Sequence, residues 1–132
     1  MGFPAAKQGD KVVGVDIHMI LPPPAPPVQP PPIPVPHPFN GTIDNNLSMK
    51  VKINGKPAAT LGSTATNTPA HVPIGGTFVV PPTNIATIMT GSPIVMIEGK
   101  PAARMTDTAM TCNDPAPAPT GVVVAVSMVL IA

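Results

Sequence analysis

The sequence has few of the side chains that usually fill a protein core or cover a binding surface. Its 132 residues include no Trp, no Tyr and three Phe, and 10% of them are charged. Seven Lys and Arg against six Asp and Glu leave a net charge of +1, which provides no field to hold phosphates. We therefore expect no nucleic-acid partner.

Cysteine is almost absent. A single Cys112 excludes an internal disulfide and with it the framework of small secreted domains. Apolar burial in a domain of this size only about balances the cost of ordering the chain, so another staple is expected. A metal ion is the usual alternative.

Long hydrophobic runs are also missing. The longest apolar stretch, residues 121–132, is shorter than the roughly 20 residues that a membrane-spanning helix needs. Its valines instead predict a buried strand that closes the domain. The first residues, MGFP, lack the basic-then-apolar order of a signal peptide, so synthesis in the cytoplasm is expected.

Proline is the abundant residue, with 22 copies spread along the chain. Each interior proline removes a backbone donor and clashes with the preceding turn, which excludes a helical bundle. A 43% hydrophobic content with little net charge also argues against disorder. The composition predicts a single, mainly β domain over residues 1–132, with little or no helix.

An internal repeat organises the other motifs. Residues 51–60 read VKINGKPAAT, residues 95–104 read VMIEGKPAAR, and a truncated copy, FPAAK, occupies residues 3–7. Each full copy predicts a short strand, a turn at Asn-Gly or Glu-Gly, and a second strand. Three such units predict a pseudo-threefold β architecture. Five residues after each motif proline comes Gly9, Gly62 or Thr106, followed by Asp10, Ser63 or Asp107.

Residues 22–38 hold eleven prolines in seventeen positions. This density predicts a stiff polyproline II connector that runs along the domain surface and delivers His37 to a fixed place. An alternative is a ligand for SH3-type domains, because Pro-x-x-Pro spacings occur here. Such spacings are unavoidable at this proline content, so the connector is the preferred interpretation.

The histidines and the cysteine follow the repeat at similar distances. Fourteen residues separate the motif proline from His18 in the first copy and from His71 in the second, and eleven separate it from Cys112 in the third. Around a pseudo-threefold axis these three side chains converge, and His37 completes a tetrahedron. Three imidazoles and a thiolate suit Zn²⁺, and four protein ligands leave no open position, as in structural sites. Iron or copper accept the same ligands, but a closed tetrahedral set favours zinc.

Other interpretations of these residues stay open. A lone buried cysteine is usually a small apolar side chain, and three histidines are an ordinary number for this length. Catalysis is not expected, and no catalytic residue is assigned. The segment around Cys112, MTCND, matches no nucleophile motif, and Gly75-Gly76 lack the Lys-Ser or Lys-Thr of a phosphate-binding loop.

Residues 97–104, IEGKPAAR, resemble the motif of the PAAR-repeat family, the spike-tip proteins of type VI secretion systems and related contractile injection machines. The segments HVPIGG at 71–76 and GSPIVMIEGK at 91–100 agree with the family pattern. Lys7 and Thr60 depart from it, because they stand where the motif has arginine.

The resemblance implies a small metal-stapled cone and a set of site residues. The family holds a metal with three His and one Cys, which match His18, His37, His71 and Cys112. Its implied function is to cap and sharpen a trimeric, β-helical spike of the VgrG type, one chain per trimer, and to help pierce the target membrane. The protein would be made in the cytoplasm and secreted or injected with the machine, with transient membrane contact. The alternative is an adaptor that docks a separate effector toxin onto the spike.

Overall fold

The computed structural model describes residues 2–132, which form thirteen β-strands and no helix, and hence no helix that could cross a membrane. The strands are β1 (Phe3–Pro4), β2 (Lys11–Leu21), β3 (Ile33–Asn45), β4 (Lys52–Ile53), β5 (Lys56–Pro57), β6 (Thr64–Asn67), β7 (Thr77–Phe78), β8 (Ile85–Ile88), β9 (Met96–Ile97), β10 (Lys100–Pro101), β11 (Thr108–Thr111), β12 (Ala118–Val124) and β13 (Leu130–Ile131).

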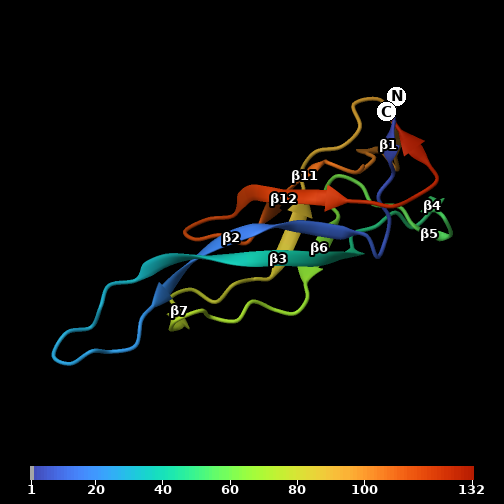
Figure 1. Cartoon of the computed structure of the whole chain (residues 1–132). Helices are drawn as coiled ribbons and strands as arrows, with labels where there is room; N and C mark the ends of the chain where they lie inside the picture. The colour runs from blue at the N-terminus through green and yellow to red at the C-terminus, as the bar shows by residue number, and fades with distance from the viewer. Residues whose placement is uncertain (1) are drawn as a thin grey trace.

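The two longest strands, β2 and β3, form an extended antiparallel ladder between the loop of the proline-rich tract and the end that carries β4 and β5 (Figure 1). The ladder extends from the Lys11–Thr42 pair to the Ile20–Ile33 pair. Burial alternates along it, because successive side chains of a strand point to opposite faces. One face of this ladder therefore lines the interior of the molecule.

A small closed barrel forms the body of the protein. The sheet order is β12-β11-β8-β6-β3-β2-β7, and the extra pairing of β12 with β2 closes six of these strands, leaving β7 outside. Phe39 is the largest side chain in the barrel core, and small residues beside it make room for its ring. A Cβ on Gly41 would lie 2.6 Å from the Phe39 ring. The core is completed by Val12, Ile43, Ala65, Ala86, Ile88, Ala109 and Val123.

Three two-stranded antiparallel pairs sit at one end of the barrel, namely β4–β5, β9–β10 and β13–β1. The first two are β-hairpins, and the third has the same form although its strands come from the two ends of the chain; we call all three hairpins. The third hairpin joins the two ends of the chain, so that the N- and C-termini lie side by side (Figure 1). The expectation that residues 121–132 form one closing strand is therefore wrong. Their first part, in β12, closes the barrel, and their last part, β13, completes the truncated first repeat.

The three Pro-Ala-Ala segments meet around a pseudo-threefold axis. Ala6 donates its backbone N–H to Ala103, Ala103 to Ala59, and Ala59 to Ala6, each at 3.0 Å, which closes a ring of three hydrogen bonds. A second ring forms at 2.9 Å, where the residue four after each motif proline donates to the proline carbonyl of another copy; its donors are Gln8, Leu61 and Met105. The predicted mainly β, pseudo-threefold fold is confirmed.

The turn after each motif is also threefold. Gly9, Gly62 and Thr106 all have positive φ, at 91°, 94° and 76°. The next residue of each copy accepts a hydrogen bond from a backbone N–H three positions earlier, through a carboxylate or a hydroxyl oxygen. The predicted hairpin turns at Asn54-Gly55 and Glu98-Gly99 likewise have positive φ at both residues, between 50° and 80°. This is the geometry of a type I′ turn.

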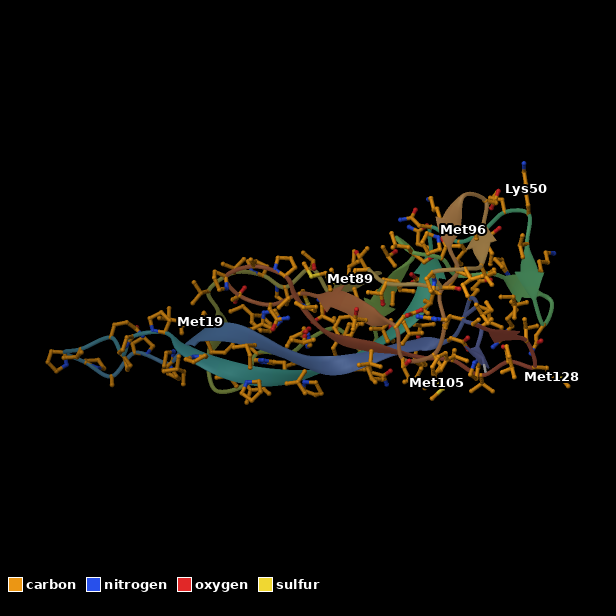
Figure 2. The ribbon with its side chains drawn as sticks, turned by 90° about the horizontal axis from the view of Figure 1, so that it is seen from above. Met19, Lys50, Met89, Met96, Met105 and Met128 are labelled. Atoms are coloured by element: carbon orange, nitrogen blue, oxygen red, sulfur yellow. The ribbon has the colours of Figure 1, made fainter. Side chains whose placement is uncertain are left out.

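The ribbon tapers from the hairpin end to a narrow end made by the proline-rich tract (Figure 1, Figure 2). Met128, Lys50 and Met96 lie toward the broad end and Met19 toward the narrow end (Figure 2). We expected residues 22–38 to form one surface connector, but residues 33–38 belong to β3 and pair with β2. Residues 22–32 form the connection between the two strands, with a bridge between Ala25 and Val28.

Candidate metal centre

The strand that follows each repeat leads to one side of a single cluster. His18 lies on β2, while His71 and Cys112 follow β6 and β11. His37 enters from β3, where its ladder partner is Asp16. The ring of His18 lies 5.4 Å from that of His37 and 4.9 Å from that of His71, centroid to centroid. The structure thus gathers the three predicted imidazole rings, and ligand atoms of His18, His71 and Cys112 lie within 4.8 Å of one another, a group that includes no nitrogen of His37.

His37 has one ring nitrogen held by a hydrogen bond, and His18 and His37 each have one buried ring nitrogen without a hydrogen-bond partner. Nδ1 of His37 donates to the Val35 carbonyl at 2.9 Å, and its buried Nε2 has no partner. Nδ1 of His18 lies 3.6 Å from Oδ2 of Asp114, and its Nε2 lies 3.8 Å from Sγ of Cys112. For His37, the outer partner on one nitrogen and the free second nitrogen are the arrangement of a metal-binding histidine.

Burial sets the protonation state of His18. The side chains of His18 and His37 are each about 1% exposed. Desolvation lowers the pKa of His18, and the neighbouring His71 lowers it further, against the opposing effect of Asp114 and Asp16. A lowered pKa keeps the imidazole neutral, which is the form that offers a lone pair to a metal.

His71 is held from two sides. Its backbone N–H donates to Oδ1 of Asn84 at 2.8 Å. Nδ2 of Asn67 donates to its Nδ1 at 3.2 Å, and its Nε2 donates to Oδ2 of Asp16 at 2.8 Å. The His71 ring is therefore fixed with Nε2 turned toward the cluster.

Cys112 is 6% exposed and carries a protonated thiol when no cation is bound. Burial raises the pKa of this thiol to about 11, and the hydrogen bond to Asp16 and the negative charge of Asp16 add to the effect. A metal ion reverses this situation, because it binds the thiolate and displaces the proton.

Asp16 is the residue that the sequence analysis missed. It is fully buried, and one oxygen atom from it groups with donor atoms of His18, His71 and Cys112, all within 4.8 Å of one another. The signal was present in the alternation of β2, because Asp16 and His18 lie two residues apart and must share a face. An acidic residue on the otherwise apolar inner face of a strand is the feature to look for.

Two aromatic rings lie next to the histidines of the cluster. The Phe78 ring lies 5.6 Å from that of His18 and 5.5 Å from that of His37, and the Phe39 ring lies 6.0 Å from that of His71. Beside them opens a cavity of about 470 Å³, lined by both His37 and His71 as well as Pro69, Val72 and Ile74. Two of the clustered histidines therefore border this cavity.

The donor set fits a metal ion. Four side chains, those of Asp16, His18, His71 and Cys112, offer two imidazole nitrogens, a sulfur and a carboxylate oxygen within 4.8 Å of one another, and His37 presents a buried nitrogen with no hydrogen-bond partner. A buried polar atom without a partner is costly unless an ion or a water binds it. Imidazole and thiolate suit zinc, iron and copper better than magnesium or calcium.

These features define a small, pseudo-threefold β-cone with a buried centre that is compatible with a metal ion. A scan against protein families matches residues 35–118, more than half of the chain, to the family described as the PAAR motif. The chain belongs to this family, the family of type VI spike-tip proteins. The match covers His37, His71 and Cys112, whereas His18 and the first repeat lie before it. A search of curated proteins found no match.

Proposed function

We propose that this protein caps a trimeric, β-helical spike of the VgrG type, with one chain per trimer. The observation that carries the proposal is the ring of backbone hydrogen bonds among Ala6, Ala59 and Ala103. It gives one polypeptide a base with three similar sides, which is the symmetry that a trimeric spike requires of a single-chain cap.

The three hairpins offer the contact surface. Their inner residues, Ile53, Ile97 and Ile131, are buried in a cluster of their own. The residue before each isoleucine is exposed: Lys52 in one hairpin, Met96 (58% exposed) and Leu130 (65%) in the others. The hairpins are separate two-stranded sheets, so their edges are free to pair with strands of the spike by β-augmentation.

The buried centre would hold one structural Zn²⁺ through His18, His37, His71 and Cys112. Neutral imidazoles and a thiolate are the ligands that zinc prefers, and an ion at this position would join β2, β3 and the segments after β6 and β11. The ion would supply cross-linking and no chemistry, which agrees with a protein that is not an enzyme.

The narrow end is suited to pass through a membrane. Residues 17–43 contain no Lys, Arg, Asp or Glu. Charged side chains are expensive to bring into lipid, and so are unpaired backbone N–H groups, which proline lacks. The eleven prolines of residues 22–38 therefore reduce the cost of membrane contact during injection. Synthesis in the cytoplasm followed by export with the machine belongs to the same proposal.

Co-purification with a trimeric spike protein tests the capping function. We expect Met96→Glu combined with Leu130→Glu to abolish binding, because both positions are exposed at the base. Val28→Glu is the matched control: Val28 is equally exposed, at 65%, but lies at the narrow end, so this variant keeps binding. Unchanged binding of the base variant, or no binding by the wild type, contradicts the proposal.

A second function, as an adaptor for a separate effector, is favoured by an asymmetry of the base. A valine precedes the first strand residue of β4, β9 and β13, and the residue before that valine is Lys50 in one hairpin but Ile94 (73% exposed) and Met128 (91%) in the other two. A symmetric spike has no use for that difference, whereas a cargo protein has. Replacing Ile94 and Met128 with Lys would remove the difference at this position. The adaptor role predicts that this variant loses cargo and keeps the spike.

A further inference from the structure

We propose that Asp16 is itself a metal ligand, bound directly through Oδ2, in addition to the three histidines and Cys112. This inference rests on the metal centre proposed above and extends its donor set. It assigns an inner-shell role to a residue outside the family match, which begins at residue 35.

The distances place Oδ2 of Asp16 among the ligand atoms. It lies 2.8 Å from Nε2 of His71, 3.2 Å from Sγ of Cys112 and 4.0 Å from Nε2 of His18. Neighbouring ligand atoms of a four- or five-coordinate zinc, with bonds of 2.0–2.1 Å, are separated by about 3–3.5 Å. An ion that binds His71 and Cys112 at ordinary bond lengths therefore lies within reach of this oxygen.

Charge favours the same assignment. Asp16 has 0% exposure, and within residues 2–132 its ion-pair partners are histidines alone, with no Lys or Arg among them. A buried carboxylate without a cation is costly. A dication with three neutral imidazoles and one thiolate keeps a charge of +1, which is equally costly in an apolar interior. The carboxylate of Asp16 makes the centre neutral.

The other oxygen of Asp16 is anchored so that Oδ2 stays in place. Oδ1 accepts hydrogen bonds from the Thr111 hydroxyl and, at 3.4 Å, from Nδ2 of Asn113. Thr111 also contacts the hydroxyl of Thr120 at 2.6 Å, which ties the group to β12. Such outer contacts orient metal-binding carboxylates and leave one oxygen for the ion.

Asp114 provides a matched comparison. Its Oδ2 lies 3.6 Å from Nδ1 of His18, on the side of the ring that faces away from Cys112, and accepts the backbone N–H of Met19 at 2.9 Å. Its position is that of an outer carboxylate, which acts on the metal only through His18. The two carboxylates therefore differ in role although both contact the same histidine.

Cobalt substitution tests the inference, because the visible bands of Co²⁺ report its inner ligands and a thiolate charge-transfer band reports Cys112. In the full-length protein, we expect Asp16→Ala to shift the visible bands of bound Co²⁺ and to keep the thiolate band. We expect Asp114→Asn to leave both bands in place. Zinc affinity, measured by chelator competition, should fall more than 100-fold in Asp16→Ala and Asp16→Asn, and by 10–100-fold in Asp114→Asn, as for outer-shell changes.

The outcomes separate the two proposals. Visible bands of Asp16→Ala that superimpose on those of the wild type, or an affinity loss no larger than that of Asp114→Asn, overturn the role of Asp16 and leave the metal centre intact. A wild-type protein that binds neither Co²⁺ nor Zn²⁺ overturns the metal centre itself. Circular dichroism shows whether each variant is folded. If Asp16→Ala is unfolded, the Co²⁺ spectrum of Asp16→Asn is compared with that of the wild type in its place, and superimposable visible bands overturn the role of Asp16.

Discussion

The backbone N–H of Ala59 donates to the carbonyl of Ala6 at 3.0 Å, although the two residues belong to different copies of the repeat. This bond and its two equivalents close a ring, so that each Pro-Ala-Ala segment is held by the other two. Alanine is required there, because a larger side chain would enter a space in which all three are completely buried.

The ring predicts the effect of a larger side chain at the axis. Ala103→Leu should destabilise the protein by about 1–3 kcal/mol or more, because extra methylene groups have no space in a closely packed core. Urea unfolding measures the change. Ala116→Leu, at an exposed position, is the control and should leave the midpoint within about 0.5 kcal/mol. Equal midpoints for the two variants would show that the axis is not tightly packed.

The metal centre predicts coupled losses of metal and stability. Cys112→Ser and His71→Ala should each lose stoichiometric zinc, measured by elemental analysis. Structural zinc binding contributes about 10–16 kcal/mol at neutral pH, so the loss of stability should exceed the roughly 2–5 kcal/mol of an ordinary core truncation. Full zinc content in both variants would refute their assignment as ligands.

Thr106 should be the weak point of the threefold turns. It has φ of 76°, where the other two copies have glycine, and a β-branched residue is strained in this conformation. We expect Thr106→Gly to raise the free energy of unfolding by about 1 kcal/mol, since relief of strain outweighs the added chain entropy. The converse variant, Gly62→Thr, should be destabilised by at least as much. A destabilised Thr106→Gly would contradict this account of the turn.

Two repeats are linked by a pH-dependent contact. The Ser48 hydroxyl donates to Oε2 of Glu98 at 2.5 Å, and the Met49 N–H donates to the same oxygen at 3.0 Å. The Ser48 hydrogen bond is the main reason why the pKa of Glu98 is lowered. Stability from this contact is present above the ordinary pKa of glutamate and is lost as the pH falls through the lowered value.

A titration of the Glu98 carboxyl by NMR checks this contact. Ser48→Ala should raise the pKa of Glu98 back toward its ordinary value, because the main hydrogen bond to the carboxylate is gone. Ser127→Ala, next to another hairpin, serves as the control and should leave the pKa of Glu98 unchanged. The same Glu98 titration curve in Ser48→Ala and the wild type would contradict the proposed cause.

The threefold part of the fold could be predicted from the sequence because it depends on short local motifs. Turns at Asn54-Gly55 and Glu98-Gly99 depend on residues next to each other, and their repetition revealed the symmetry. The third hairpin could not be predicted in the same way. It pairs β1 with β13 across the whole chain, and no local pattern in residues 121–132 indicates that the last strand leaves the barrel.

Two features of the centre and the narrow end depended on long-range contacts. The prediction of a polyproline II connector over residues 22–38 was wrong for residues 33–38, because they become a strand only through pairing with β2. The alternation of β2 places Asp16 beside His18, but its contact with His71, at 2.8 Å and 55 residues away, depends on the fold. The spacing of His18, His71 and Cys112 from the repeat, in contrast, did predict that they converge.

Native mass spectrometry of the protein mixed with a trimeric spike tests the central claim most directly. A single chain with a pseudo-threefold base predicts a complex of three spike chains and one copy of this protein, at any excess of the latter. Three copies per trimer, or no complex at all, would contradict the account.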